Sequence, residues 1–134
     1  AQGNRDDLSK ILCGGPMMGF ALGSLEYPVL KGTTGILFFT HDSALAVVIP
    51  EQNCVRCGSC VDVCPMFLEP TVIVKAVKRE KWLDAASANI ASCIECGCCS
   101  YICPSHIPLV QYLRMGKQFI TTDGTGGHNP LFQA

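Results

Sequence analysis

Short apolar runs dominate the first part of the chain, and their length and composition are typical of β-strands. Residues 35–40 and 44–49 are such runs, and the polar residues His41, Asp42 and Ser43 separate them. Two strand-like runs joined by so short a connection favour a β-hairpin. Pro50 follows directly and ends the second run. We therefore expect residues 1–50 to form a β-rich segment.

The glycine-rich stretch at residues 14–19, GGPMMG, is typical of a turn. A phosphate-binding loop is the alternative interpretation. However, the stretch lacks the G-x-G-x-x-G order and the amphipathic helix that should follow it. The pattern therefore favours a structural turn.

Beyond Pro70 the apolar positions change to a helical period. They recur at intervals of three and four, which predicts a helix through this region. The residues on this expected stripe are Val72, Ala76, Arg79, Leu83, Ala86 and Ile90. Arg79 interrupts the stripe and weakens it.

A second helix is expected after Pro104. Ser105 is a suitable N-cap and Pro108 a suitable first-turn residue. One face of this helix would carry Leu109, Tyr112, Leu113 and Gly116. From residue 119 the glycine-rich sequence predicts a tail.

Together these patterns predict an α+β fold with three zones. Residues 1–50 form the β-rich segment, residues 51–118 an α-helical domain, and residues 119–134 the tail. The formal net charge of −1 gives no electrostatic support for nucleic-acid binding. No run of 18 apolar residues indicates a transmembrane helix, and no segment is typical of a signal peptide.

Eight of the ten cysteines form two copies of one motif, C-x2-C-x2-C-x3-C-P. This is the bacterial ferredoxin pattern for [4Fe–4S] clusters, in which two-residue spacings let the backbone fold closely around the cluster. The copies are Cys54, Cys57, Cys60 and Cys64 before Pro65, and Cys93, Cys96, Cys99 and Cys103 before Pro104. The motifs therefore predict that residues 51–118 are an α-helical ferredoxin-type domain with two [4Fe–4S] clusters and one-electron chemistry.

In two-cluster ferredoxins the fourth cysteine of each motif binds the other cluster. We therefore expect a crossed assignment. Cluster 1 takes Cys54, Cys57, Cys60 and Cys103, and cluster 2 takes Cys93, Cys96, Cys99 and Cys64. Glycines 58 and 97 follow ligands and would let backbone amides approach the sulfurs. An apolar shell around the clusters is expected from Val55, Val61, Val63, Ile94 and Ile102.

Zinc and disulfides are the alternatives for these cysteines. Structural zinc sites use paired C-x2-C units and close with four ligands. Such a site explains neither the third cysteine at the same two-residue spacing nor the proline after the fourth cysteine. A disulfide framework suits a small secreted domain, and C-x2-C runs are poor disulfide geometry. Thiolates on iron instead indicate a reducing, cytoplasmic environment.

Two cysteines lie outside the ligand pattern. Cys98 is interpreted as a small, partly buried thiol, or else as an alternative ligand if Cys99 is lost. Cys13 is expected in the core of a different segment. The basic residues Lys75, Lys78 and Arg79 share a helical face, either as a solvated surface or as a docking patch for an acidic redox partner.

Three segments, in this order, carry a family resemblance: GGPMMGFALGSLEYPVLKGTTGIL, NCVRCGSCVDVCPMFLEP and CIECGCCSYICPSHIPLVQYLRMGK. Over roughly residues 10–118 the chain resembles the C-terminal part of the C subunit of the Rnf electron-transport complex. Cys98 departs from the pattern, because a small non-ligand residue is expected there.

The resemblance implies that residues 1–50 are the end of a β-grasp domain and its connection. It also implies a peripheral location on the cytoplasmic side of the membrane, with electrons passing toward the iron–sulfur B subunit and with ferredoxin as a further candidate partner.

The resemblance further implies that FMN and NADH would bind a preceding part of the polypeptide. This chain alone has no segment for either, so it should not oxidise NADH and should have no turnover of its own. The chain opens on Ala1 and not on methionine, which suggests a piece of a longer polypeptide.

Two other functions remain open at this point. Corrinoid-reducing proteins resemble the same family and deliver electrons to a cobalamin. Alternatively, the metal centres serve only as staples of an assembly module.

Overall fold

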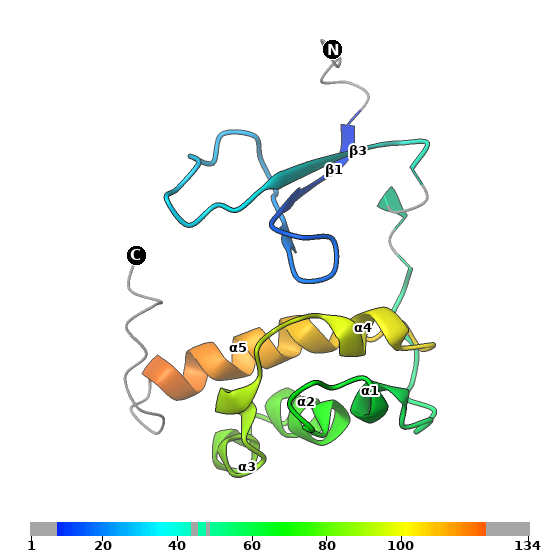
Figure 1. The fold of residues 1–134 in the computed structure, drawn as a ribbon, viewed down its shortest axis with the longest axis vertical. Coiled ribbons are helices and arrows are strands. Elements are labelled where there is room, and N and C mark those ends of the chain that lie inside the picture. Colours follow the sequence, from blue (N-terminus) through cyan, green and yellow to red (C-terminus); the bar gives the residue numbers. More distant parts are fainter. Residues whose placement is uncertain (1–7, 44–45, 48, 123–134) are drawn as a thin grey trace. The chain divides into compact units, whose positions relative to one another are not determined.

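The computed structural model describes residues 8–43, 46–47 and 49–122. These residues divide into two compact units after Pro50. The first unit contains a small antiparallel sheet and the second contains helices (Figure 1). The α+β class is thus confirmed, whereas the assignment of the sheet to a β-grasp domain stays a prediction.

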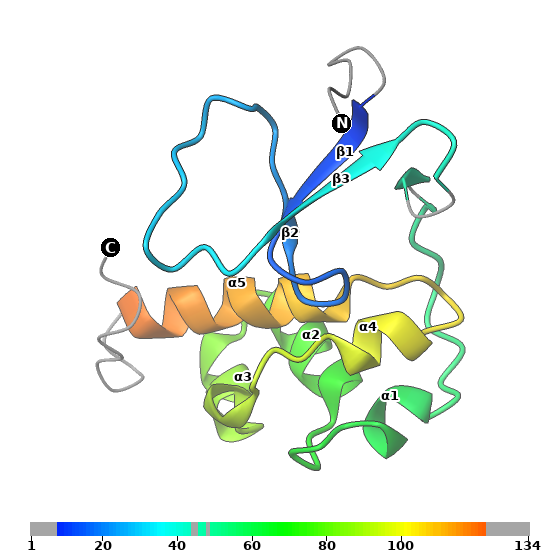
Figure 2. The ribbon, with the colours of Figure 1, turned by 45° about the horizontal axis from the view of Figure 1, so that its top comes forward.

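The sheet of the first unit has the strand order β2-β1-β3 (Figure 2). Its strands are β1 (Leu8–Cys13), β2 (Phe20–Ala21) and β3 (Ile36–Thr40). Leu12 of β1 lies opposite Ala21 on one side and Leu37 on the other. It is the buried residue of β1, so the central strand supplies the centre of this small unit.

The expected hairpin between residues 35–40 and 44–49 is wrong. The strand β3 forms as predicted, but it pairs with β1, more than twenty positions earlier. Ala46, Val47 and Ile49 are the described residues of the second run, and none of them is in a strand. An apolar run indicates that a segment can become a strand, but its partner is set by burial of the side chains in the folded unit.

The stretch at residues 14–19 is a turn between β1 and β2, as predicted. Gly14 has φ of 100° and donates its N–H to the carbonyl of Gly35 at 2.8 Å. A Cβ atom at Gly19 would lie only 2.6 Å from the carbonyl oxygen of Gly15. The turn therefore closes too tightly for a side chain at Gly19.

The second unit consists of short helices packed on one longer helix (Figure 1). The longer helix is α5 (Leu109–Thr122), which packs against α2, α3 and α4. The others are α1 (Ser59–Asp62), α2 (Pro70–Lys78), α3 (Trp82–Ser87), the 3-10 helix η3 (Ile90–Ser92) and α4 (Cys98–Ile102).

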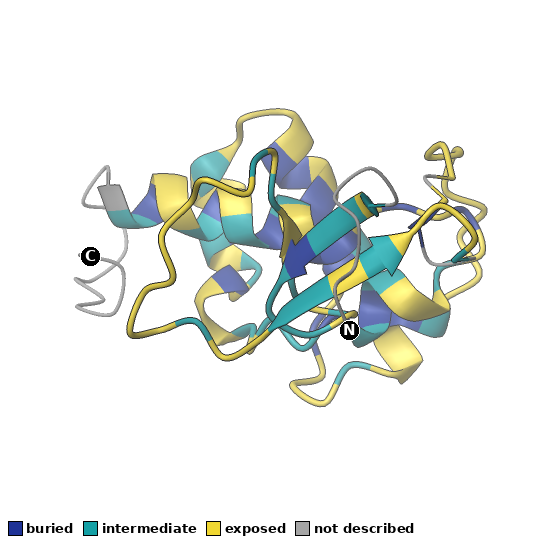
Figure 3. Ribbon diagram, turned by 90° about the horizontal axis from the view of Figure 1, so that it is seen from above, coloured by how far each residue is buried: buried dark blue, intermediate teal, exposed yellow. Residues whose placement is uncertain are grey.

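The core of this unit lies between α2, α5 and the segment around η3, where buried positions alternate with exposed ones along each helix (Figure 3). Its most deeply buried large side chains are Ile73, Val77, Ile90, Leu109 and Leu113. Gly116 also belongs to this contact, because a Cβ there would lie 2.5 Å from the Cγ2 of Val77. The face predicted for α5 is thus the face that packs.

The single helical stripe predicted from Val72 to Ile90 is wrong. Glu80 and Asn89 adopt positive φ values of 56° and 58°, and the chain turns at each of them. The segment is therefore divided into α2, α3 and η3. Ala76 and Ile90 are buried as predicted, but Val72 and Leu83 are exposed. Ile73, Val74 and Val77 contribute the rest of the buried apolar face of α2.

The two ends of α5 also differ from expectation. Ser105 does not cap the helix, because its hydroxyl donates to the carbonyl of Asn53 at 2.9 Å. The hydroxyl of Ser100 in α4 accepts the N–H of Val110 at 2.8 Å and so satisfies one donor of the first turn. At the other end, residues 119–122 continue the helix instead of beginning a tail. The rest of the predicted tail lies outside the described residues.

Candidate iron–sulfur site

The two cysteine motifs fold into the same backbone. In each motif the residue before the second cysteine and the glycine after it have positive φ: Arg56 and Gly58 in the first, Glu95 and Gly97 in the second. The glycine then begins a short helix, α1 or α4. Only glycine adopts this conformation without a steric penalty, which accounts for a glycine at this place in each copy.

The repeat extends past the fourth cysteine. Phe67 and His106, each three residues after that cysteine, have φ of 53° and 50°. Their N–H groups donate to the carbonyls of Cys64 and Cys103, both at 3.1 Å. Local sequence thus gives the same turn twice, and the contact between α1 and α4 brings the copies together.

The first motif meets the end of the second through the segment that precedes Cys54. The N–H of Gln52 donates to the carbonyl of Ser105, and the Ser105 hydroxyl donates to the carbonyl of Asn53, both at 2.9 Å. These bonds hold the start of one motif beside the end of the other. Cys103, two residues before Ser105, is near enough to the first motif for its charge to act on the pKa of Cys60.

The thiols of this first set differ in exposure. Cys54 and Cys57 are exposed, whereas Cys60 is buried. Burial raises the pKa of the Cys60 thiol, and the nearby thiolates of Cys103, Cys57 and Cys54 act in the same direction. At the exposed Cys57 the hydrogen bonds from Ser59 lower the thiol pKa.

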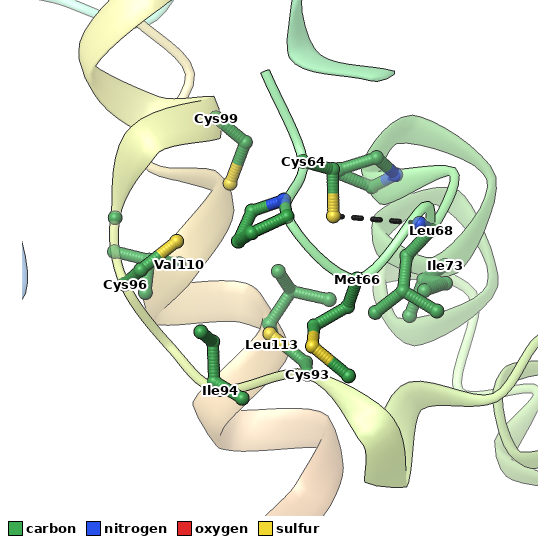
Figure 4. A pocket seen from close by; sticks show the side chains of 13 residues that line it. Cys64, Met66, Leu68, Ile73, Cys93, Ile94, Cys96, Cys99, Val110 and Leu113 are labelled. Carbon is green, nitrogen blue, oxygen red and sulfur yellow. Dashed lines mark hydrogen bonds between the residues drawn. The ribbon is translucent and has the colours of Figure 1, made fainter. Parts of the chain in front are cut away.

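The second set lines a cavity (Figure 4). Cys93, Cys96 and Cys99 of the second motif reach it together with Cys64 of the first. Apart from Ile94, the apolar part of its wall comes from residues that were not expected in the shell around the clusters. These residues are Pro65, Met66, Leu68, Pro70, Ile73, Ile94, Val110 and Leu113.

Burial raises the pKa of two thiols of this second set. It raises the pKa of Cys99 to about 11. It also raises the pKa of Cys93, where the backbone N–H of Glu95 and the charge of Lys117 act in the opposite direction. Lone thiolates are costly in such surroundings, and metal binding would replace their protons.

Backbone amides already point at sulfurs of the second set. The N–H of Leu68 donates to the Sγ of Cys64, and the N–H of Glu95 donates to the Sγ of Cys93, each at 3.4 Å (Figure 4 shows the first). Thiolates gathered in an apolar wall, with amide donors on the sulfurs, fit the requirements of an iron–sulfur cluster.

A partly buried ion-pair network borders the second set, and no local sequence pattern indicates it. The carboxylate of Glu95 accepts from the Nε of Arg114 at 2.8 Å and from the Nζ of Lys117 at 3.1 Å. The Nζ of Lys117 also donates to the carbonyl of Cys93. Two cations of α5 are thus anchored beside a candidate ligand.

The remaining residues of the predicted shell do not line this cavity. Val55, Val61, Val63 and Ile102 are exposed and are absent from its wall. Ile94 does line the cavity, although its side chain is otherwise largely exposed. The apolar surroundings of the second set therefore come mainly from α2, α5 and the segment after Cys64.

The other candidate residues are not among those that line the cavity. Cys98 is half-buried, and a hydrogen bond with Cys96 raises its pKa. Cys13 is half-buried in β1.

Of the basic residues expected to share a face of α2, Lys78 pairs with Glu51. Its Nζ lies 4.4 Å from the ring centroid of Tyr112. Lys75 and Arg79 are exposed, so a docking patch on this helix stays a prediction.

Within the described residues, no group of three or more cysteine, histidine, aspartate or glutamate side chains surrounds a position for a single metal ion. A cubane differs from a single ion in this respect, because its thiolates bind separate irons. Over the same residues, no helix is long and apolar enough to cross a membrane.

Comparison with known proteins agrees with the geometry. Residues 46–104 match the family described as "4Fe-4S dicluster domain". The chain is 44% identical over 119 residues to the C subunit of the Na(+)-translocating ferredoxin:NAD(+) oxidoreductase complex of Acetobacterium woodii. It is 47% identical over 112 residues to the C subunit of the ion-translocating oxidoreductase complex of Yersinia enterocolitica. It is 42% identical over 113 residues to the C subunit of the proton-translocating ferredoxin:NAD(+) oxidoreductase complex of Clostridium ljungdahlii.

These alignments cover 89%, 84% and 84% of the chain, respectively. They cover only 26%, 16% and 24% of the relatives, so the chain spans about a quarter of their length or less. The similarity agrees with the family resemblance of the sequence. The chain belongs to the family formed by the C subunits of Rnf-type ion-translocating oxidoreductase complexes.

Proposed function

We propose that this chain binds two [4Fe–4S] clusters and relays single electrons within an Rnf-type complex. When bound, such a cluster supplies a one-electron carrier whose potential depends on its protein surroundings. The observation that carries the proposal is the cavity where Cys64 of one motif joins Cys93, Cys96 and Cys99 of the other.

The proposed ligands follow the crossed assignment. Cys54, Cys57, Cys60 and Cys103 hold cluster 1, while Cys64, Cys93, Cys96 and Cys99 hold cluster 2. Two observations support this division. Cys103, Cys57 and Cys54 are the thiolates that act on Cys60, and Cys64 is among the groups that act on Cys93.

The chain's own residues have three tasks in this function. The cysteines bind iron, and amides such as those of Leu68 and Glu95 stabilise the sulfurs by hydrogen bonds. Apolar residues such as Met66 and Leu113 limit water at the second set. The exposed Cys54 and Cys57 make the first set the more accessible one for electron exchange with a partner.

The surroundings of the chain are part of the same proposal. It works as a peripheral element on the cytoplasmic side of the membrane, with the iron–sulfur B subunit and ferredoxin as candidate partners. FMN and NADH bind other parts of the full-length polypeptide. The names of the relatives support a place in a multi-subunit complex, because they describe subunits of ion-translocating oxidoreductase complexes.

The first test is iron and acid-labile sulfide analysis of anaerobically purified protein, with EPR before and after dithionite. We expect about eight iron and eight sulfide per chain and a reduced signal that shows coupling between two clusters. Zinc without sulfide, or clusters that dithionite does not reduce, would contradict the relay. Rapid reduction of cob(III)alamin without transfer to the B subunit would instead favour corrinoid reduction.

The crossed assignment is tested by Cys64→Ala. Cys64 lines the same cavity as Cys93, Cys96 and Cys99, so the variant should lose the EPR signal of cluster 2 and keep that of cluster 1. Cys103→Ala is the matched variant and should have the opposite effect. Loss of cluster 1 in Cys64→Ala would show that each motif binds its own cluster.

A further inference from the structure

The inference rests on the proposed function and concerns the ion-pair network at the second set. Glu95 lies between the ligands Cys93 and Cys96, and it binds Arg114 and Lys117 of α5. The side chains of Glu95, Arg114 and Lys117 are largely removed from solvent, with exposed fractions of 15%, 27% and 19%. Their charges are therefore screened less than those of surface pairs.

Lys117 contacts the backbone of the loop that carries Cys93 and Cys96. Its Nζ donates both to the Glu95 carboxylate and to the carbonyl of Cys93. The carboxylate thus fixes the ammonium group against the backbone of a ligand residue. Since Arg114 also pairs with Glu95, the network carries one net positive charge next to the second set.

The first set differs at the equivalent place. Arg56 holds the position in the first motif that Glu95 holds in the second, with nearly the same φ, 57° against 58°. The residue is exposed, so a charge there is screened by water. Two loops with one backbone therefore differ in their electrostatic surroundings.

A cluster held by four thiolates is negatively charged, and it gains negative charge when it takes up an electron. Burial disfavours that gain, whereas a cation held nearby favours it. We propose that Lys117, positioned by Glu95, raises the reduction potential of cluster 2 and leaves that of cluster 1 nearly unchanged. Lys117 is thus a residue that sets the energy of one step in the relay.

The test is an EPR-monitored redox titration of the chain with both clusters in place. Lys117→Met removes the charge, and Lys117→Gln removes the charge but keeps a hydrogen-bond donor for the carbonyl of Cys93. In both variants we expect one of the two midpoints to shift to a more negative potential. Lys117→Arg retains the charge and should restore the midpoint toward the wild-type value.

The control is Lys75→Met, which changes the net charge equally at an exposed position of α2. It should leave both midpoints in place. Cys57→Ser changes a proposed ligand of cluster 1, so the midpoint that it alters identifies cluster 1. The midpoint that changes in Cys57→Ser should be the one that stays constant in Lys117→Gln.

The proposal would be overturned if both midpoints of Lys117→Gln equalled those of Lys75→Met. It would also be overturned if Lys117→Gln shifted the midpoint of cluster 1, which Cys57→Ser identifies. If Lys117→Met loses iron, Lys117→Gln decides the question. Failure of this inference is distinguishable from failure of the proposed function. Wild-type protein without eight iron and sulfide would contradict the function, whereas two intact clusters with an unmoved midpoint would contradict only the role of Lys117.

Discussion

At the scale of single residues, Gly116 shows how closely α5 packs. A Cβ at this position would lie 2.5 Å from Val77 Cγ2 and 2.8 Å from Ile90 Cδ1. Both neighbours are buried branched side chains with little room to move. The absent side chain is therefore what allows α5 to approach α2 and η3.

We expect Gly116→Ala to destabilise the helical unit by about 1–3 kcal/mol through overpacking, despite the better helix propensity of alanine. Chemical denaturation of the cluster-loaded protein measures this change. Val77→Ala removes the nearer obstacle, so the double variant should be more stable than the sum of the single effects predicts. Strict additivity would contradict the proposed clash.

Cys98 lies within the second motif but outside the proposed ligand set. It is half-buried and bonds to Cys96, but it does not line the cavity with Cys93, Cys96 and Cys99. Cys98→Ala should therefore keep about eight iron per chain and both EPR signals. Cys96→Ala is the matched variant and should lose cluster 2. Loss of a cluster in Cys98→Ala would make Cys98 a ligand.

At the scale of elements, Glu51 attaches the start of the helical unit to two helices. Its carboxylate pairs with Lys78 of α2 and accepts from the hydroxyl of Tyr112 of α5 at 3.0 Å. The hydrogen bond with Lys78 lowers the pKa of Glu51 below its ordinary value of 4.5 and raises the pKa of Lys78 above 10.5. The pair is about one-third exposed, so its contribution is screened by solvent.

The sign of the pH dependence follows from the lowered pKa of Glu51. The unfolded chain binds the proton more readily, so the pair stabilises the folded state above pH 4.5 and loses this effect as the pH falls through the folded pKa. We expect Glu51→Gln to lower the free energy of unfolding by less than about 1 kcal/mol at pH 7. Denaturant titrations of both proteins should show a constant difference from pH 8 to 5 that shrinks below 4.5.

A difference that changes near pH 6 to 7 would show that another group is responsible. Glu80→Gln provides the matched control, because Glu80 is an exposed glutamate of the same unit and the same charge is removed. The stability of this variant should follow that of the wild type across the same range of pH.

At the scale of the whole molecule, the two motifs form one folding unit. Residues 52 and 53 bond to Ser105, α1 packs on α4, and Cys64 lies with the second motif. Metal binding and folding are coupled when the ligands come from separate parts of a chain. Each proposed cluster would therefore connect both halves of the unit.

Removal of iron should consequently destabilise the helices as a group. After treatment with an oxidant and a chelator, we expect a clear fall in the thermal midpoint followed by circular dichroism at 222 nm. Cys13→Ala, a change in the other unit, should leave the difference between loaded and iron-free protein intact. An iron-free protein with the same midpoint would show that the clusters do not stabilise the fold.

Some parts of this structure are encoded locally. The motif spacing with Gly58 and Gly97 gives two equal turns, because glycine adopts the positive φ at these positions without a steric penalty. Pro108 and the apolar period after it predict α5, whose buried face includes Leu109 and Leu113 as expected. The chemistry of the cysteines is likewise apparent from their order.

The sequence by itself thus determined the α+β class, the family and the iron–sulfur chemistry, since each depends on residue type and short spacing. Only the tertiary structure decided that β3 pairs with β1, that Ser100 serves the first turn of α5, and that Phe119 stacks on Trp82 with centroids 4.7 Å apart. It also placed Lys117 beside Cys93. The physical reason is that these contacts join distant segments, so they depend on how buried surfaces fit together and not on any local pattern.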